Sequence, residues 1–446
     1  MKAGTIYALA SGRGQAGIAV IRISGPGAGG ALAALAQKMP LPRCATRVSL
    51  IDPTDGGLLD DSLALWFPGP ASFTGEDVVE FHLHGGIAVV AGVIEALASI
   101  DGLRPAEAGE FTRRAFENGK MDLTGAEAVA DLVAAETAAQ RSQALRQMRG
   151  ALAALYEDWR ARLLKAQAHM EAAIDFSEDE LPGNLVTEVR RLVSDMAAEL
   201  ERHLADGGRG ERLRDGLELA IVGPPNVGKS SLFNTLAGRD AAIVSPVAGT
   251  TRDVIEVHLD IGGFPVLIAD TAGLRDSADA IEAEGVSRAE ARGRSADLRL
   301  VVFSAETWPD AGPAELALID ENSIVVINKS DLGMPKPALV AGRPGVVISV
   351  KTGDGIGQLL SALEVWVERR FGHDEAPPLT RARHREALEG CRDRLREFTA
   401  IGDIAGQAEI GAEHLRMAGR ALGRITGKVD VEDLLDLIFR DFCIGK

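Results

Sequence analysis

The 446-residue sequence has few cysteines, few aromatic residues and no long run of uncharged apolar residues. Its three cysteines, Cys44, Cys391 and Cys443, lie far apart and lack the spacing of metal ligands, so neither a disulfide framework nor a cysteine metal site is expected. No run approaches the ~18 apolar residues that a membrane helix requires. The N-terminus also lacks the pattern of a signal peptide. These absences predict a cytoplasmic protein that does not associate with membranes.

Positive charge is also scarce, because 48 Lys and Arg residues stand against 65 Asp and Glu residues, a formal net charge of −17. Proteins that bind nucleic acid by themselves usually carry a basic surface. If this chain acts on nucleic acid, we expect another chain, or a local basic patch, to supply much of the phosphate contact. The chain is 46% hydrophobic, enough for sizeable cores, and its length predicts two to four domains.

The most informative segment is residues 223–230, GPPNVGKS, which has the G-x-x-x-x-G-K-S form of a phosphate-binding P-loop. An apolar strand-like run, 217–222, precedes it, and a helix is expected over 231–236. Lys229 supplies positive charge for the β- and γ-phosphates, and the Ser230 hydroxyl can ligate Mg²⁺. The predicted nucleotide contacts in this loop are Asn226, Val227, Gly228, Lys229, Ser230 and Ser231.

A second motif indicates which base the bound nucleotide carries. Asn328-Lys329-Ser330-Asp331 follows an apolar strand, 324–327, and the Asp331 carboxylate can accept two N–H bonds from the guanine edge. Adenine has no matching pair of donors, and polar readout of this kind discriminates strongly. Further along the chain, Ser349-Val350-Lys351 closes the base pocket. The sequence therefore predicts GTP as the nucleotide.

Two loops complete the pattern of a Ras-like GTPase. Asp270-Thr271-Ala272-Gly273 follows a strand, so that Asp270 can reach Mg²⁺ through water and the Gly273 amide can meet the γ-phosphate. Before it, residues 249–253 form a switch-like loop that offers a threonine to Mg²⁺. Five such motifs in the expected order indicate a GTPase, whereas each alone is a weak signal and a lone Asn-Lys-x-Asp can be a polar turn after a strand.

The hydrolytic step must differ from that of Ras, because Leu274 occupies the place of the water-orienting glutamine. Asn226 could bind a monovalent cation beside the phosphates, with backbone carbonyls of residues 244–249 wrapped over it. Such a cation would stabilise developing charge as an arginine finger does. Glu282 could hold the attacking water, or it could be a solvated residue at the start of a helix, and its residue type leaves both readings open.

The pattern along the chain predicts four segments: α/β over residues 1–118, helical over 119–213, the GTPase over 214–371 and helical over 372–446. In the first segment, strands are expected at residues 5–10, 17–24, 48–51, 62–66 and 78–82, and helices at 87–99 and 109–118. The last segment is short for a core of its own, so we expect the helical segments to pack together around an inserted GTPase. Two separate helical modules are the alternative.

The termini carry polar residues next to glycines, at 22–25, 73–80, 84–86 and 109–112, where strands are expected to end. Such clusters form binding sites, or they are simple turns. The last four residues, Cys443-Ile444-Gly445-Lys446, make a poor prenylation box. Taken by themselves, they predict a frayed tail.

Taken together, these motifs resemble the MnmE (TrmE) family of tRNA modification GTPases over essentially the full length of the chain. Besides the GTPase motifs, the resemblance is carried by Arg22-Ile23-Ser24-Gly25, Phe73-Thr74-Gly75-Glu76-Asp77, Gly109-Glu110-Phe111-Thr112, Asn118-Gly119-Lys120-Met121-Asp122-Leu123, Ile174-Asp175-Phe176 and Cys443-Ile444-Gly445-Lys446. The chain departs from the family pattern at Ala108, Gly125 and Val350, where Pro, Gln and Ala are usual. None of these departures removes a functional side chain.

The resemblance implies a multidomain α/β plus all-α fold: an N-terminal α/β folate-binding domain that dimerises, a split helical domain and an inserted Ras-like P-loop GTPase. It implies a homodimer that joins a flavoprotein partner, MnmG (GidA), in a heterotetramer, with the tRNA held largely by the partner. The implied reaction adds an aminomethyl-type group, carboxymethylaminomethyl, to C5 of the wobble uridine. The one-carbon unit would come from 5,10-methylenetetrahydrofolate, with 5-formyltetrahydrofolate as an analogue, and the nitrogen from glycine or ammonia.

The resemblance also implies roles for single residues. Those that match folate contacts are Arg22, Glu80, Lys120 and Lys446. The match to a K⁺ site covers Asn226 and the backbone of Ser245, Val247 and Thr250. Ser230 and Thr251 match the Mg²⁺ ligands, and Glu282 matches the residue that orients water. Cys443 matches a terminal thiol, which we count with Glu282 and Lys229 as a catalytic candidate.

Two other functions remain compatible with the motifs. The chain could be a ribosome-assembly or signalling GTPase without small-molecule chemistry. It could also be a folate-dependent one-carbon transferase with a regulatory GTPase and no RNA role, which the acidic charge favours. Folate binding to residues 1–118 distinguishes the first from the family function, and tRNA binding distinguishes the second.

Overall fold

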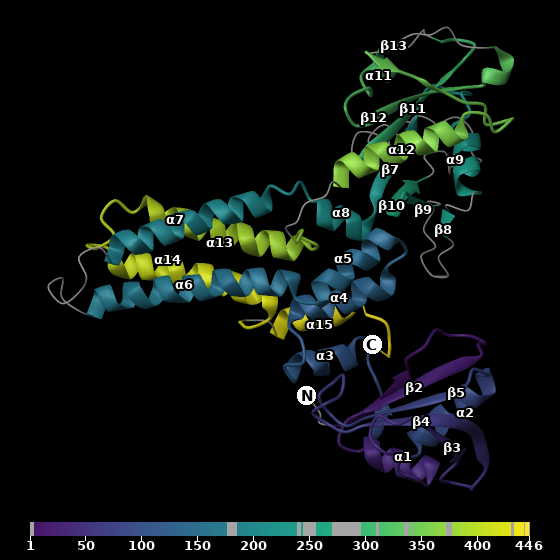
Figure 1. Ribbon diagram of the computed structural model, residues 1–446, viewed down its shortest axis with the longest axis vertical. Coiled ribbons are helices and arrows are strands. Elements are labelled where there is room, and N and C mark those ends of the chain that lie inside the picture. The colour runs from purple at the N-terminus through teal and green to yellow at the C-terminus, as the bar shows by residue number, and fades with distance from the viewer. Residues whose placement is uncertain are drawn as a thin grey trace, which may run out of the picture. The chain divides into compact units, whose positions relative to one another are not determined.

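The structure is a computed structural model that describes residues 4–175, 185–238, 242–243, 256–269, 296–308, 312–333, 339–340, 342–371, 377–429, 432–440 and 442–445 (Figure 1). The chain forms two compact units. The first contains Met1–Ala130, Gln147–Ala197 and Ala387–Lys446, and the second contains Asp131–Arg146 and Ala198–Glu386. Among the described residues, no helix combines the length and the apolar character needed to cross a membrane.

A six-stranded sheet dominates the N-terminal part of the first unit, in the order β3-β4-β5-β2-β1-β6 (Figure 1). Its strands are β1 (Thr5–Leu9), β2 (Ile18–Ser24), β3 (Thr46–Ile51), β4 (Leu58–Phe67), β5 (Val78–His84) and β6 (Leu103–Pro105). Neighbours pair antiparallel except β1 with β6, which are parallel. Helices α1 (Ala28–Ala36) and α2 (Ile87–Ala98) pack on one face, where Ile21, Leu32 and Leu97 are fully buried.

The other face of this sheet is covered in part by α3 (Glu110–Glu117). Phe111 of this helix packs with Ile6 and Ala8 of β1 and with Phe73 of the loop before β5. Successive side chains of a strand point to opposite faces, so the residues of β1 and β2 contribute to a packed layer on each side of the sheet. The sheet thus has one face sealed by helices and a second face on which polar side chains and α3 meet.

This part differs from the sequence-based expectation at several elements. Strand β6 was not expected, because three residues that end in proline give no strand pattern. Helix α1 was not expected, because its sequence AGGALAALA contains two glycines, which disfavour helix. Strand β4 starts at Leu58 rather than at residue 62. It extends through Asp61, since the Ser49 hydroxyl and Arg47 on β3 hydrogen-bond that carboxylate and lower its pKa.

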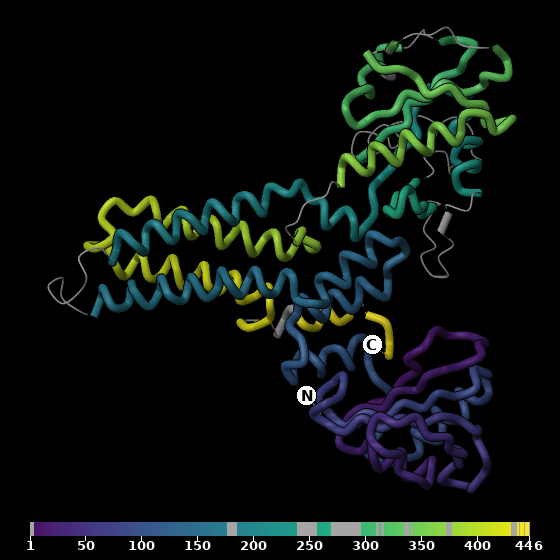
Figure 2. The backbone as a smooth tube through the Cα atoms, viewed as in Figure 1, coloured from purple at the N-terminus to yellow at the C-terminus, as the bar shows by residue number. Residues whose placement is uncertain are grey.

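Long helices form the rest of the first unit and continue into the second. They are α4 (Leu123–Ala134), α5 (Ala138–Met148), α6 (Ala151–Asp175), α7 (Leu185–Leu204), α13 (Ala382–Ala400), α14 (Ala408–Thr426) and α15 (Glu432–Arg440). Helix α14 lies along α6 (Figure 2). The Gln167 side-chain amide of α6 donates to the Leu415 carbonyl oxygen of α14 at 2.7 Å. Helical segments from both sides of the GTPase therefore pack together.

The second unit is built on a seven-stranded sheet in the order β15-β12-β11-β7-β10-β9-β8. Its strands are β7 (Leu217–Val222), β8 (Ala242–Ile243), β9 (Glu256–Ile261), β10 (Phe264–Ala269), β11 (Leu298–Ser304), β12 (Ser323–Asn328) and β15 (Val346–Val347). Strand β9 pairs antiparallel with β10 and β8, and the other pairs are parallel. This is the predicted Ras-like arrangement.

Helices cover one face of this sheet and form a single core with its strands, whereas Ala220, Val222 and Phe303 on the same strands belong to a separate cluster. Leu232 and Leu236 of α9 (Lys229–Ala237) and Leu359 and Leu363 of α12 (Ile356–Phe371) pack with the strands and are almost fully buried. The smaller elements are α8 (Arg209–Asp215), α11 (Pro313–Leu316), the 3₁₀ turn η1 (Ser330–Leu332), β13 (Leu339–Val340) and β14 (Arg343–Pro344). Five parallel strands end at one edge of the sheet, which is where ligands bind in folds of this kind.

Arg385 ties together the two places where the chain enters and leaves the GTPase. Its guanidinium lies 2.8 Å from the Asp206 carboxylate and 3.0 Å from that of Glu211. Partial burial opposes the charge, but hydrogen bonds to Glu211 and Asp206 raise the pKa of Arg385 above its ordinary value. Gly210 passes so close to Leu379 that an added Cβ would lie 2.1 Å from its carbonyl oxygen. The two ends of the insertion are therefore held side by side.

Candidate functional site

The P-loop connects the end of β7 to the start of α9, as predicted. Gly228 caps α9 with φ +95°, and Asn226 also adopts a left-handed conformation, with φ +62°. At Gly223, a Cβ would lie 2.2 Å from the Val302 carbonyl oxygen. Only glycine can therefore follow β7 here, and the loop directs the N–H groups at the start of α9 toward a common point.

Lys229 lies over this loop. Its Nζ donates to the carbonyl oxygens of Gly223, at 2.9 Å, and Pro224, at 2.8 Å. Ser230 is half-buried in the first turn of α9, whereas Asn226 and Ser231 are exposed and Val227 is buried. The ammonium is thus placed above the N–H groups that would surround phosphate oxygens, and the Ser230 hydroxyl sits beside them.

Asn328, at the end of β12, joins the P-loop to the base pocket. Its side-chain amide donates to the Val227 carbonyl oxygen at 2.8 Å and its side-chain oxygen accepts the Val350 N–H at 3.1 Å. A Cβ on Gly228 would lie 2.4 Å from this amide nitrogen, so glycine at 228 makes room for Asn328. Three segments far apart in the sequence therefore meet at one buried side chain, which is 3% exposed.

Asp331, the residue predicted to recognise the base, is held by two neighbouring side chains. The Ser349 hydroxyl donates to Oδ1 of Asp331 at 2.8 Å, and Lys351 Nζ lies 3.8 Å from Oδ2. Lys329 adopts a left-handed conformation, with φ +64°, and its Nζ lies 3.6 Å from a Glu306 carboxylate oxygen. The carboxylate that sequence analysis assigned to guanine is thus oriented by the loop that was expected to close the pocket.

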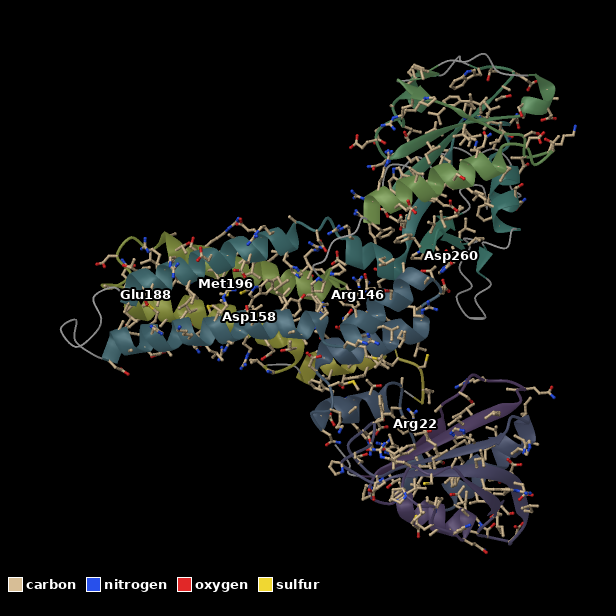
Figure 3. The ribbon with its side chains drawn as sticks, in the orientation of Figure 1. Arg22, Arg146, Asp158, Glu188, Met196 and Asp260 are labelled. Carbon is tan, nitrogen blue, oxygen red and sulfur yellow. The ribbon has the colours of Figure 1, made fainter. Side chains whose placement is uncertain are left out.

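A second group of predicted residues meets on the N-terminal sheet, which carries Arg22 on β2 (Figure 3). In the register of the sheet, Arg22 pairs with Glu80 on β5. The Arg22 Nε donates to Oε1 of Glu80 at 2.9 Å, and both side chains are less than one-fifth exposed. The guanidinium carbon of Arg22 lies 5.4 Å from the ring centre of Phe73 and 5.8 Å from that of Phe111. Two aromatic faces and one carboxylate therefore fix the cation.

Lys120 belongs to the same region through the loop at residues 70–75. Its Nζ donates to the Pro70 carbonyl oxygen at 2.9 Å, and the Asn118 amide donates to the Thr74 carbonyl oxygen at 2.7 Å. Lys120 is exposed, so its ammonium is available to an anionic ligand. The structure thus brings Arg22, Glu80 and Lys120 onto neighbouring elements of one domain.

The C-terminal tail docks on this domain, and the expectation of a frayed end is wrong. Ile444 forms an antiparallel bridge with Ala108, and the Gly109 N–H donates to the Cys443 carbonyl oxygen at 3.4 Å. The Arg22 guanidinium donates to the carbonyl oxygen of Gly445 at 3.5 Å. The Cys443 thiol is exposed and forms no disulfide. The tail thereby brings this thiol to the domain that carries Arg22.

Glu110 organises this region, a role that its sequence neighbours do not indicate. Its carboxylate is 5% exposed and accepts from Arg104 at 2.8 Å and Arg114 at 2.9 Å. Burial opposes its ionisation, but hydrogen bonds from Arg104, the Glu107 N–H and Arg114 lower the pKa of Glu110 below its ordinary value. Arg114 also donates to Glu76 at 3.0 Å. The motif at 109–112 therefore fixes both the tail and the loop before β5.

Ten predicted site residues lie outside the described part of the chain: Ser245, Val247, Thr250, Thr251, Asp270, Thr271, Ala272, Gly273, Glu282 and Lys446. In the described ranges, no cluster of three or more His, Cys, Asp or Glu residues is suited to a metal ion. The half-buried Ser230 hydroxyl at the P-loop fits Mg²⁺ when the nucleotide phosphates supply further oxygens. The P-loop and the Asp331 pocket together fit a guanine nucleotide.

Comparisons with known proteins identify related chains. The family model described as "GTP-binding protein TrmE N-terminus" matches residues 5–120, and the model described as "MnmE helical domain" matches residues 123–443. The chain is 56% identical over 444 residues to the tRNA modification GTPase MnmE of Paramagnetospirillum magneticum, covering 99% of each chain. It is 56% identical over 443 residues to that of Parvibaculum lavamentivorans, covering 99% of this chain and 100% of the relative. For that of Rhodospirillum rubrum, identity is 53% over 459 residues, with full coverage of both.

Proposed function

Because the chain belongs to the MnmE family of tRNA modification GTPases, we propose that its GTP hydrolysis serves the addition of a carboxymethylaminomethyl group to C5 of a wobble uridine. The predicted family resemblance is confirmed, and so is the fold class. The observation that supports this reaction is the group of residues on the N-terminal sheet, which we call the second site. There the docked tail brings Cys443 to the domain that carries Arg22 and Lys120. Membership of a family of tRNA modification GTPases argues against a signalling GTPase and against a folate transferase without an RNA role, although the acidic charge by itself favours the latter.

The second site is proposed to bind a reduced folate. Its proposed contacts are Arg22, Glu80, Lys120 and Lys446, of which the Lys446 ammonium would pair with the anionic glutamate part. When bound, 5,10-methylenetetrahydrofolate supplies the one-carbon unit. Arg22 also holds the Gly445 carbonyl oxygen, so it couples ligand binding to the position of the tail. Cys443 would then lie close to the reacting group.

The proposal includes partners for the remaining steps. A flavoprotein of the MnmG type supplies redox chemistry and holds most of the tRNA, which agrees with the net charge of −17 of this chain. Two copies of the chain pair through their N-terminal domains, and the dimer joins the flavoprotein in a heterotetramer. Light scattering of the separate and mixed proteins tests this assembly, since a monomer that forms no mixed complex contradicts it.

Replacing Arg22 with alanine is expected to weaken binding of 5-formyltetrahydrofolate by about 10- to 100-fold, the loss that follows when a hydrogen-bonded charge is removed. Calorimetry on the full chain measures this affinity. Arg47→Ala is the matched control, because Arg47 lies on the same sheet with its side chain 79% exposed. GTP hydrolysis should stay normal in both variants.

Lys120→Ala serves as a second variant, because it leaves the Arg22–Glu80 pair and the tail contact in place. It is expected to weaken folate binding without disturbing the fold. Wild-type affinity for the folate in both Arg22→Ala and Lys120→Ala would remove folate chemistry from the proposal. The family function in tRNA modification would then require another one-carbon source.

In the GTPase, we propose that Lys229, Ser230, Thr251 and Asp270 hold the phosphates and Mg²⁺. Leu274 cannot orient water, so charge on the transferred phosphate must be neutralised in another way. We propose K⁺ for that role, held by the Asn226 side chain and the backbone of Ser245, Val247 and Thr250. Asn226 is exposed in the P-loop beside the phosphate position.

GTP hydrolysis is therefore expected to require K⁺ and to fall by about 10² or more in NaCl at matched ionic strength, because an ion in this place does the work of an arginine finger. Asn226→Ala should lose the stimulation while it still binds nucleotide. Asn234→Ala is the control, since Asn234 is an exposed asparagine on the following helix. Equal turnover in the two salts contradicts the assignment.

Glu282→Ala separates water placement from cation binding. If Glu282 orients the attacking water, the variant should lose about 10² or more of the rate in both salts and keep its GTP affinity. A wild-type rate would show that Glu282 is a solvated surface residue.

A further inference from the structure

A stripe of positive charge runs along α14. Arg416, Arg420 and Arg424 follow one another at intervals of four residues, and Lys428 continues the spacing just beyond the helix. Arg416, Arg420 and Arg424 therefore share one face of α14, with a rise of about 6 Å between successive residues, and Lys428 follows the left-handed C-cap Gly427. All four residues are exposed. We call these four residues the basic stripe.

The basic stripe stands out against the composition of the chain, whose net charge is −17. No acidic residue occurs between Glu413 and Lys428 in the sequence. Arg416 pairs with Glu413, and Lys428 Nζ lies 2.6 Å from a Glu157 carboxylate oxygen. Exposed pairs of this kind contribute little to stability, so a multiply charged anion can replace them.

The helix that carries the stripe is firmly seated. Leu415, Ala418 and Leu422 on its other side are buried. Gly419 allows the helix to approach the Gln167 side-chain amide of α6, which would lie 2.8 Å from an added Cβ. The charges therefore project from a rigid element, which is how a surface for a large ligand is built.

One end of the stripe leads to the folate-site region. An added Cβ on Gly427 would lie 2.6 Å from the Phe116 ring, which packs in one cluster with Leu123, Phe439 and Phe442. Phe442 immediately precedes Cys443, and Lys120 lies four residues after Phe116. The stripe thus ends against the same hydrophobic cluster that supports the tail.

We propose that the basic stripe binds the phosphate backbone of the tRNA and directs the wobble nucleotide toward Cys443. This inference rests on the proposed function for the identity of the ligand, and it assigns part of the tRNA contact to this chain. Contacts to phosphates position a nucleic acid without reading its sequence, which suits an enzyme that must orient several tRNAs. An alternative explanation for these cations is that they stabilise the helix dipole. This explains Arg424 and Lys428 near the C-terminus of α14, but it does not explain Arg416 and Arg420 in earlier turns.

The test measures tRNA binding to the full chain by fluorescence anisotropy over a range of KCl concentrations. Arg420→Gln/Arg424→Gln is compared with Arg369→Gln/Arg370→Gln, which removes the same charge from exposed positions at the end of α12. Each lost phosphate contact should reduce the slope of log affinity against log salt by about 0.7–0.9. The stripe variant should therefore lose about 1.5 in slope and about tenfold in affinity at low salt, while the control matches wild type.

Unchanged affinity and slope in the stripe variant would overturn the proposal, as would equal losses in the control or a wild-type chain that binds no tRNA. A stripe variant that keeps tRNA binding but no longer binds the flavoprotein would show that the stripe recognises a protein, which also overturns it. GTP hydrolysis without tRNA should be the same in all variants. Failure of the proposed function would look different: stripe-dependent tRNA binding would persist, but nucleoside analysis would find no modified uridine.

Discussion

Deletion of residues 443–446 is expected to abolish tRNA modification and to leave GTP hydrolysis at the wild-type rate. The nucleotide-binding residues predicted here lie between 223 and 351, whereas the tail contacts Ala108, Gly109 and Arg22 in the N-terminal domain. The deletion removes Cys443 and Lys446 together and frees the Arg22 guanidinium from the Gly445 carbonyl oxygen. Nucleoside analysis of tRNA treated with the complex measures modification, and phosphate release measures hydrolysis.

A point variant tests whether docking of the tail, and not merely its presence, is required. Gly109 has φ +67°, and an added Cβ would lie 2.8 Å from the Phe439 carbonyl oxygen and 3.0 Å from Cβ of Phe442. Gly109→Ala should therefore displace the tail and lose most of the modification. Gly102→Ala is the control, since Gly102 has a similar φ, +84°, but open space around the added Cβ. Full modification after the deletion would refute the role of the tail, and loss of hydrolysis alone would assign the tail to the GTPase.

The outcome at the tail illustrates where sequence reasoning reached its limit. Four residues with no helical or strand pattern predict fraying when they are considered by themselves. Their order depends on partners more than 300 positions away, because Gly445 packs against Leu9 and Ala10 and Ile444 pairs with Ala108. Only the family resemblance pointed to a docked tail, since no local physical signal encodes such a contact.

Glu110 was missed for a related reason. An acid in the first turn of a helix is an ordinary capping residue, and its sequence neighbours do not reveal that Arg104 and Arg114 converge on it. Helix α1 was missed because glycine lowers helix propensity, yet Ala31, Leu32 and Leu35 bury its apolar side against the sheet. Tertiary packing decides both cases.

The nucleotide site was predictable in far greater detail. A P-loop is a contiguous segment whose glycines are required by local backbone conformation, as Gly223 and Gly228 show. The base pocket was also expected, because Asn328 and Asp331 follow a recognisable buried strand. The sequence did not reveal that Asn328 bridges Val227 and Val350, since that contact depends on how three strands are aligned.

Asp331→Asn is expected to lower the affinity for GTP by about 10³-fold or more and to create a preference for xanthosine triphosphate. The Ser349 hydroxyl donates to Oδ1 of Asp331 at 2.8 Å, so an amide at this position keeps its oxygen toward Ser349 and turns its NH₂ group toward the base. Guanine presents N–H donors there, so the new NH₂ group and the guanine donor would face each other and both would stay unpaired. Unpaired buried polar groups account for a loss of affinity of this size. Xanthine presents a carbonyl oxygen at C2, which can accept from the new NH₂ group.

Asp354→Asn is the matched control for this change. Asp354 is an exposed acid of the same loop region and accepts from the Thr352 hydroxyl at 2.7 Å, so the variant alters the charge by the same amount without touching the base. Calorimetric titrations with GTP and with xanthosine triphosphate should give wild-type values for the control and inverted preference for Asp331→Asn. Unchanged GTP affinity in Asp331→Asn would mean that guanine is recognised elsewhere. A loss for both nucleotides would indicate instead that the Asp331 carboxylate maintains the pocket through Lys351, which lies 3.8 Å away.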